Sequence, residues 1–208
     1  MRYTINRMGR RNKQVLFGTT NSAKIRHVRA YLEALPVEVL SPGDLNIDIV
    51  VEEDGRTPEE NAEKKARAYY AAAKMPTFAI DAGLRIEKFP EESQPGVYVR
   101  RISGGPGASD AALLDYYRKS LDEVGGTSPA VWYIAVSFVA SADRVGTQHF
   151  TLQAVMTSQP SHIVHRDAPL SSLMLDPATG RYYSEMAYRE RPDSVLITEI
   201  LSRHLEGL

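Results

Sequence analysis

The chain has 208 residues, of which 43% are hydrophobic, and a formal net charge of −1, so it is long enough to bury a sizeable core. The near-neutral balance gives no overall field toward nucleic acid or a membrane surface, and we expect neither as a partner. The sequence contains no cysteine, no apolar run long enough to span a bilayer and no apolar secretory core in its first residues, which excludes disulfides and thiol chemistry and favours a soluble cytoplasmic protein.

We interpret the first 13 residues as a basic N-terminal arm, followed by one domain over residues 14–208. The arm carries four basic side chains, which are Arg7, Arg10, Arg11 and Lys13. Terminal segments of this kind are usually frayed and solvated. We therefore expect the arm to have no part in the chemistry.

Residues 15–19 have the apolar character of a buried strand, and apolar residues recur at helical spacing over residues 22–34. The polar turn between them therefore lies at the start of a helix. The free N–H groups and the positive dipole end at a helix N-terminus attract anions. We predict a phosphate-binding turn formed by Thr19, Thr20, Asn21 and Lys24.

Two short strands, 37–40 and 47–51, are predicted next, and a helix follows them. Thr57 as the N-cap and Glu60 three residues later have the pattern of a capping box. The alanine-rich sequence then predicts that the helix runs to about Lys74.

An acidic segment, residues 52–55, directly precedes this helix. On the helix, Asn61 and Lys65 are four residues apart and share one face. The neighbours of Lys65 on that face are small, so its ammonium group can approach another element closely. A solvated surface charge is an equally supported interpretation from the spacing alone.

A third polar position, Asp81, follows the apolar strand predicted over residues 77–81. Gly83 permits a turn after it, and residues 84–89 alternate like a half-exposed strand. A carboxylate at the end of an apolar strand lies where α/β proteins bind their ligands. The alternative is an Asp that bonds its own backbone within a turn.

The second half of the chain predicts a Pro- and Gly-rich loop over residues 90–107 and a helix over residues 109–122. Two strands, 131–140 and 150–157, then form an antiparallel pair, and Asp193 or Ser194 caps a final helix. Alternating strands and helices followed by a hairpin predict an α/β fold with a mixed sheet. The hairpin is suited to carry a second lobe, with a cleft between the lobes.

The three polar clusters supply complementary groups. Mg²⁺ prefers a few carboxylate oxygens together with water and substrate phosphates. Phosphoryl transfer needs little more than positioning and charge neutralisation. The sequence therefore predicts a Mg²⁺-triphosphate site. Its donors to the phosphates are Thr19, Asn21, Lys24 and Lys65, and its carboxylates are Glu53 and Asp81.

At these residues the chain resembles the Ham1/ITPase-like family of nucleoside triphosphate pyrophosphatases, which act on non-standard purines. Residues 19–24 correspond to the family pattern T-G-N-x-x-K, and residues 53–66 to E-x-G-x-T-F-x-E-N-A-x-x-K-A. Residues 80–84 correspond to D-D-S-G-L, and residues 95–104 to P-G-V-Y-S-A-R-x-x-G. A weaker likeness to F-A-E-M, at residues 183–186, extends the match.

The resemblance implies an elongated two-lobed α/β fold, with a long mixed central β-sheet flanked by helices, and a homodimer. The implied enzyme is a hydrolase that uses Mg²⁺ as cofactor and converts a nucleoside triphosphate to the monophosphate and pyrophosphate. Thr19, Thr20, Asn21, Lys24 and Lys65 would hold phosphates. Glu53 and Asp81 would hold the metal, with Glu52 as the alternative to Glu53 if the register slips by one. Asp81 and Lys65 would be the catalytic residues, and Asp81 would also orient or deprotonate water.

The sequence departs from the family at several positions. Ile80 and Ala82 stand where the family has Asp and Ser. The base-recognition segments F-G-Y-D and S-H-R are absent near residues 169–172 and 195–197. The recognised base and the survival of catalysis are therefore left open, as is the role of residues 158–208. A catalytically impaired nucleotide-binding or regulatory protein on the same fold is the alternative.

Overall fold

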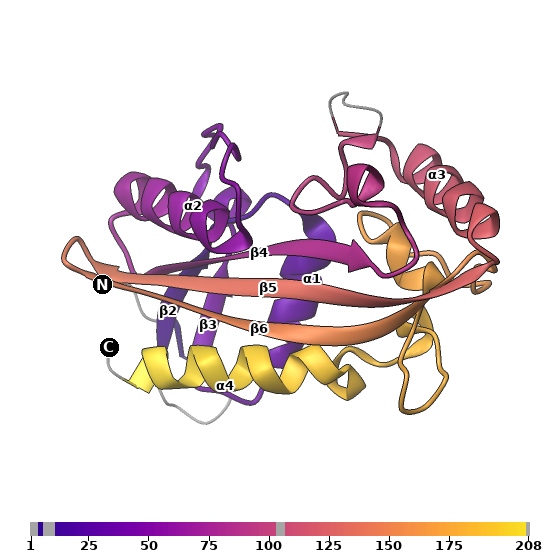
Figure 1. Cartoon of the computed structure of the whole chain (residues 1–208). Coiled ribbons are helices and arrows are strands. Elements are labelled where there is room, and N and C mark those ends of the chain that lie inside the picture. The colour runs from indigo at the N-terminus through magenta and orange to yellow at the C-terminus, as the bar shows by residue number, and fades with distance from the viewer. Residues whose placement is uncertain (1–3, 6–10, 103–106, 207–208) are drawn as a thin grey trace. The chain divides into compact units, whose positions relative to one another are not determined.

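A computed structural model of the chain describes residues 4–5, 11–102 and 107–206, and Figure 1 shows its elements. The described residues form four α-helices: α1 (Ser22–Tyr31), α2 (Pro58–Ala73), α3 (Asp110–Glu123) and α4 (Pro192–Glu206). Their strands are β1 (Thr4–Ile5), β2 (Arg11–Phe17), β3 (Val37–Leu40), β4 (Thr77–Ile86), β5 (Thr127–Ser141), β6 (Arg144–Thr157) and β7 (Met174–Leu175). Short 3₁₀ helices lie at Pro42–Leu45, Glu91–Ser93, Pro169–Leu173, Tyr183–Glu185 and Tyr188–Glu190.

The strands form one mixed sheet in the order β1-β2-β4-β5-β6-β7, with β3 paired to β2 outside that path. Strand β2 runs parallel to both β3 and β4, whereas β1 pairs with β2 and β7 pairs with β6 in the antiparallel direction. Parallel strands joined by helices and an antiparallel portion are typical of a mixed α/β fold. The predicted fold class is therefore confirmed.

The chain divides into two compact units. The first contains residues 1–81, 134–150 and 192–208, and the second contains residues 82–133 and 151–191. The assignment of residues 14–208 to one domain stays a prediction. Among the described residues, no helix combines the length and the apolar character that crossing a bilayer requires.

The core of the first unit is built where β2 meets β4. Phe17 and Phe78 are register partners in the two strands, and their rings stack with centroids 4.6 Å apart. Both are fully buried. Helix α4 lies beside α1, and the Tyr31 hydroxyl donates to Asp193 at 3.1 Å. These contacts hold the ends of β2 and β4 together and hold α4 against α1.

The core of the second unit centres on α3. Leu113, Tyr117 and Leu121 are four residues apart and are all buried, so they form one apolar helix face. Helix α3 contacts the 3₁₀ helix at Pro169–Leu173, whose Leu173 is fully buried. Ser109 caps the helix by accepting from the Ala112 N–H at 3.2 Å, so the helix begins one residue after the predicted start.

The strand predicted over residues 47–51 is wrong. Exposure does alternate along this segment, as it would in a strand, and Val50 is almost fully exposed. Within the described residues, however, the segment pairs with no strand. Alternation alone predicts an extended backbone, but a strand also needs a hydrogen-bonding neighbour.

The turn predicted at Gly83 is also wrong, because residues 77–86 form the single strand β4. Gly83 stays in the extended region and is buried within the strand. Asp81 therefore lies in the middle of a long strand and not at its end. The strand continues because the Leu84 and Gly96 backbones exchange two hydrogen bonds beyond this point.

The predicted basic arm is only partly described, since residues 1–3 and 6–10 lie outside the described residues. Residues 11–13 belong to β2, which thus begins four residues before the predicted strand start at residue 15. Lys13 has a structural role, because its ammonium group donates to the Leu205 carbonyl at the end of α4, at 3.1 Å. A cation there also complements the negative dipole end of the helix.

Candidate active site

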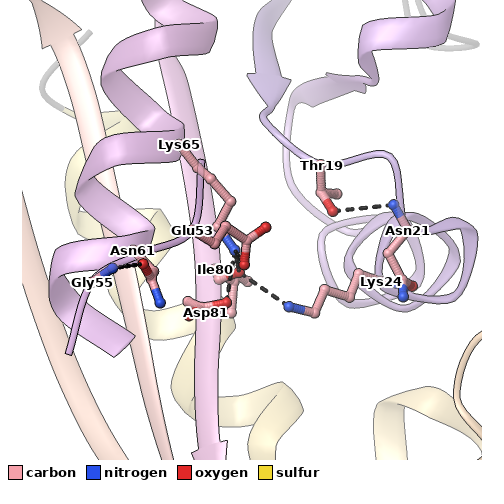
Figure 2. A network of polar contacts seen from close by, with 9 residues as sticks. All are labelled: Thr19, Asn21, Lys24, Glu53, Gly55, Asn61, Lys65, Ile80 and Asp81. Atoms are coloured by element: carbon pink, nitrogen blue, oxygen red, sulfur yellow. Dashed lines mark hydrogen bonds and ion pairs between the residues drawn. The ribbon is translucent and has the colours of Figure 1, made fainter. Parts of the chain in front are cut away.

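The parallel pairing of β2 and β4 places two of the predicted clusters next to each other. Phe17 and Phe78 are register partners, and they lie shortly before Thr19 and Asp81 in their strands. The Gly18 N–H donates to the Phe78 carbonyl at 2.8 Å, which holds the turn after β2 against β4. Asp81 lies three residues further along β4, and the turn that starts at Thr19 faces the same region (Figure 2).

The turn before α1 has the geometry of a capped helix N-terminus. Asn21 is the N-cap, and its side-chain oxygen accepts from the Lys24 N–H at 2.8 Å. Thr19 accepts from the Asn21 N–H at 3.2 Å. Thr20 is exposed at the tip of the turn. The four predicted phosphate-binding residues of this turn thus lie at the positive end of the α1 dipole.

Lys24 extends from α1 toward β4, and its ammonium group donates to the Ile80 carbonyl at 3.2 Å. Burial and, secondarily, the neighbouring charge of Lys65 lower the pKa of Lys24 to about 8, whereas the charges of Asp81 and Glu53 oppose this change. An added anion would relieve this penalty, so the position is suited to bind one.

Lys65 is buried on α2, with 6% of its surface exposed, so its interpretation as a solvated charge is wrong. Its ammonium group lies 2.7 Å from Asp81 Oδ1 and 3.3 Å from Glu53 Oε2, and it also donates to the Ile80 carbonyl at 3.4 Å. Lysines from two different helices therefore meet at one carbonyl of β4 (Figure 2). Buried charges are tolerated only when they are paired in this way.

Asp81 is the most enclosed carboxylate of the site, with 6% of its surface exposed. Its Oδ1 atom accepts from Lys65, but its buried Oδ2 atom has no hydrogen-bond partner among the described residues. An unpartnered buried oxygen is costly unless a ligand completes it. Asp81 does not bond its own backbone here, so the turn interpretation does not apply.

Glu53, and not Glu52, is the acidic residue beside Lys65. Its side chain is 44% exposed, so the carboxylate contacts the buried lysine and is also accessible to solvent. Two hard oxygen donors, one with an unpartnered oxygen, fit Mg²⁺, which takes its remaining ligands from water and phosphate. No group of three or more potential ligands (His, Cys, Asp or Glu) occurs within the described ranges.

The sequence did not reveal how the Glu53 segment is held. Asn61 is buried on α2 and its side-chain oxygen accepts from the Gly55 N–H at 2.9 Å. A β-carbon on Gly55 would lie 2.6 Å from that oxygen, so glycine is needed for the approach. The signal in the sequence was the shared helix face of Asn61 and Lys65, but it did not identify the partner of Asn61.

The remaining predicted features are distributed elsewhere. Ile80 contributes its carbonyl oxygen to both lysines, and its side chain is 7% exposed. Residues 195–197 lie in α4, and residues 169–172 lie in a 3₁₀ helix. Ser103 and Gly104, which end the fourth matching segment, lie outside the described residues.

Comparison with known proteins gives a consistent set of matches. The sequence matches the Ham1 family over residues 15–164. A dITP/XTP pyrophosphatase from Leptospira interrogans is 37% identical over 141 residues, which cover 66% of this chain and 66% of that protein. Another from Anaeromyxobacter dehalogenans is 30% identical over 186 residues, covering 88% of this chain and 67% of that protein. The chain thus spans about two thirds of the length of these relatives.

Solved structures show the same fold. A HAM1 protein from Coxiella burnetii aligns with a TM-score of 0.70 at 19% identity, covering 92% of this chain and 99% of that one. The Ham1 protein of Staphylococcus aureus aligns with a TM-score of 0.66 at 20% identity, covering 92% of this chain and 100% of that one.

Proposed function

The chain belongs to the Ham1 family, and from this membership and the geometry of its site we propose that it hydrolyses a nucleoside triphosphate to the monophosphate and pyrophosphate with Mg²⁺ as cofactor. The observation that carries the proposal is the convergence of two lysines, a helix N-terminus and two carboxylates within one compact unit (Figure 2). The names of the relatives, which are dITP/XTP pyrophosphatases, support this reaction class.

In the proposed reaction, a water oxygen forms a bond to the α-phosphorus while the bond to the oxygen bridging the α- and β-phosphates breaks. Pyrophosphate leaves with the electron pair of that bond. The turn at residues 19–24 and the ammonium groups of Lys24 and Lys65 would bind the phosphates and neutralise their charge. Glu53 and Asp81 would hold Mg²⁺, which supplies positive charge to the phosphate oxygens.

Asp81 has two distinct oxygens for this chemistry. Oδ1 is held by Lys65, so the orientation of the carboxylate is fixed. The unpartnered Oδ2 is the oxygen available to the metal or to a proton of the attacking water. We assign Asp81 and Lys65 as the catalytic residues on this basis.

The direct test is pyrophosphate release from a panel of standard and modified nucleoside triphosphates with Mg²⁺. We expect turnover of at least one triphosphate by the wild type and a loss of rate of about 10²-fold or more in Asp81→Asn. The substitution removes the carboxylate charge that would hold the metal, and the metal would neutralise the negative charge that develops on the phosphates. Arg67→Ala is the matched control, because Arg67 pairs with Glu63 on the exposed side of α2. No turnover of any triphosphate, or an unchanged rate in Asp81→Asn, would reject the proposal.

One observation favours a second candidate, a nucleotide-binding protein without catalysis. The side chain of Ile80 supplies no carboxylate at a position next to Asp81, so the described site has only two acidic groups beside its lysines. Thermal stabilisation by triphosphate and Mg²⁺ without pyrophosphate release would favour this alternative. The homodimer and the cytoplasmic location stay predictions, and light scattering of the purified protein tests the first of them.

A further inference from the structure

Helix α2 contacts all three polar clusters through a single buried face. Asn61, Lys65 and Tyr69 are four residues apart, so they lie in one row along the helix. Their exposed fractions are only 2%, 6% and 5%. Lys65 contacts the carboxylates directly, whereas Asn61 and Tyr69 contact the segments that carry the other site residues.

The Asn61 end of the row meets the segment that carries Glu53. The buried hydrogen bond from the Gly55 N–H to Asn61 is 2.9 Å long, and a β-carbon on Gly55 would also lie 2.9 Å from Glu60 Cβ. Backbone and helix are thus in direct contact two residues after Glu53. This is closer than any other residue type at position 55 would allow.

Two further attachments beside Gly55 are exposed. Lys64 pairs with Asp54, and the Arg56 N–H donates to Glu60 at 2.6 Å. Exposed ion pairs contribute about 0–1 kcal/mol, whereas a buried N–H left without an acceptor costs about 1–3 kcal/mol. The Asn61 hydrogen bond is therefore a stronger attachment of this backbone to α2 than these two exposed contacts, and it acts beside the direct contact of Glu53 with Lys65.

The Tyr69 end of the row meets the phosphate-binding turn. A β-carbon on Gly18 would lie 2.7 Å from Tyr69 Cδ2, so the tyrosine ring packs directly on the backbone just before Thr19. Gly18 also bonds to the Phe78 carbonyl, so the backbone here is fixed between the ring and β4. A side chain at position 18 would therefore have to displace either the ring or the start of the turn.

We propose that Asn61 and Tyr69 are positioning residues on either side of Lys65. Asn61 fixes the position of the Glu53 carboxylate, and Tyr69 fixes the position of the phosphate-binding turn. The inference rests on the proposed function, because it assigns the metal to Glu53 and Asp81 and the phosphates to the turn. The two contacts involve different glycines at opposite ends of the row. Burial and, secondarily, the charges of Glu53 and Asp48 raise the pKa of Tyr69, so its hydroxyl interacts electrostatically with Glu53, whereas its ring is the part that packs on Gly18. We therefore expect the Asn61 hydrogen bond to act on the metal and the ring contact to act on the phosphates.

The experiment measures two probes separately on the folded protein. Binding of Mn²⁺ alone, at millimolar concentration, is followed by the loss of the free-ion electron paramagnetic resonance signal. Binding of inorganic tripolyphosphate is followed by calorimetry in the presence of EDTA. We expect Asn61→Ala to lower the Mn²⁺ affinity about tenfold, as other supporting contacts of metal ligands do, and to leave the tripolyphosphate affinity unchanged.

The opposite pattern is expected at the other end of the row. Gly18→Ala, which forces the ring of Tyr69 away, should lower the tripolyphosphate affinity roughly tenfold and leave the Mn²⁺ affinity unchanged. Tyr69→Phe keeps the ring against Gly18 and should retain the wild-type affinity. Asn61→Asp keeps an oxygen for the Gly55 N–H and adds a carboxylate, so its Mn²⁺ affinity should equal or exceed that of the wild type.

Arg67→Ala again serves as the control on the exposed face of α2, with both affinities unchanged. Equal losses of both probes in Asn61→Ala and Gly18→Ala, or a loss in Asn61→Asp as large as in Asn61→Ala, would overturn the inference. A wild type that binds both probes without hydrolysing a triphosphate would reject only the proposed hydrolysis. A wild type that binds neither would overturn both.

Discussion

Lys24 and Lys65 both reach the Ile80 carbonyl, but their charges are balanced differently. The ammonium group of Lys65 lies within 3.3 Å of two carboxylates, whereas the ammonium group of Lys24 donates to a carbonyl oxygen. Burial and the charge of Lys65 therefore dominate at Lys24 and lower its pKa to about 8. Lys24 is thus the cation of the site with the most to gain from a bound phosphate.

This difference predicts a specific pH dependence of stability. The pKa of Lys24 is about 8 in the folded protein, below its ordinary value of 10.5, so the unfolded chain binds more protons between these two pH values. The contribution of Lys24 to the free energy of unfolding is therefore lowest below pH 8. It rises with pH between 8 and 10.5 and is constant above that range.

Lys24→Met removes the buried charge and with it this dependence. We expect the variant to be more stable than the wild type at pH 7, by on the order of 1–2 kcal/mol after allowance for solvent screening, and the difference to shrink as the pH approaches 10. Urea unfolding of both proteins at pH 7 and pH 10 measures it. A stability difference that is the same at both values would show that Lys24 has an ordinary pKa.

At the scale of elements, α2 determines the site because it carries Lys65 and the two residues that contact the neighbouring segments. Its first turn is held by Thr57, whose hydroxyl oxygen accepts from the Glu60 N–H at 3.2 Å. The Glu60 carboxylate accepts from the Arg56 N–H in place of the Thr57 N–H, so the prediction of a capping box is wrong in its second hydrogen bond. The N-cap itself was predicted correctly.

Removing this cap should destabilise the first turn of α2. We expect Thr57→Ala to lower the free energy of unfolding by about 1 kcal/mol, because an N–H at the helix end loses its partner. Thr57→Ser keeps the hydroxyl and should restore most of the loss. Thermal denaturation measures both variants, and equal destabilisation by alanine and serine would contradict the assigned role of the hydroxyl.

Elements with explicit end signals could be predicted from the sequence, and elements defined by their partners could not. The predicted N-cap Thr57 located the start of α2, and the helix predicted over residues 109–122 matches α3 closely. The segment 47–51 and the continuous strand β4 were misread, because alternation and a glycine do not show which backbone lies alongside. Two of the three polar clusters were found because they lie in a capped turn or directly before a helix. Asp81 was found although the strand end predicted there is wrong, because a carboxylate within an apolar strand is itself a signal.

The assembly of those clusters required tertiary contacts. Asp81 and Lys65 are 16 residues apart, and Lys24 and Ile80 are 56 apart. No local pattern reports such distances, and the roles of Asn61 and Tyr69 depend on them entirely. Residue types therefore predicted what the site contains, and the structure adds how it is held.

At the scale of the whole molecule, the site belongs to one of the two compact units. All of its residues lie within residues 1–81, and this unit is completed by residues 134–150 and by α4. Contacts between Tyr31 and Asp193 and between Lys13 and Leu205 tie α4 to the same unit across more than half of the chain. The C-terminal helix thus supports the elements that carry the site, a role the sequence did not indicate.

The central claim is that separate segments of this unit surround one metal-bound triphosphate. The most direct measurement is a crystal structure with Mn²⁺ and a non-hydrolysable triphosphate analogue, in which anomalous scattering locates the metal. We predict that the metal lies on the carboxylates of Glu53 and Asp81 and that the phosphates contact the turn at residues 19–24 and the ammonium of Lys65. A metal bound elsewhere, or phosphates that leave this turn and Lys65 untouched, would contradict the account.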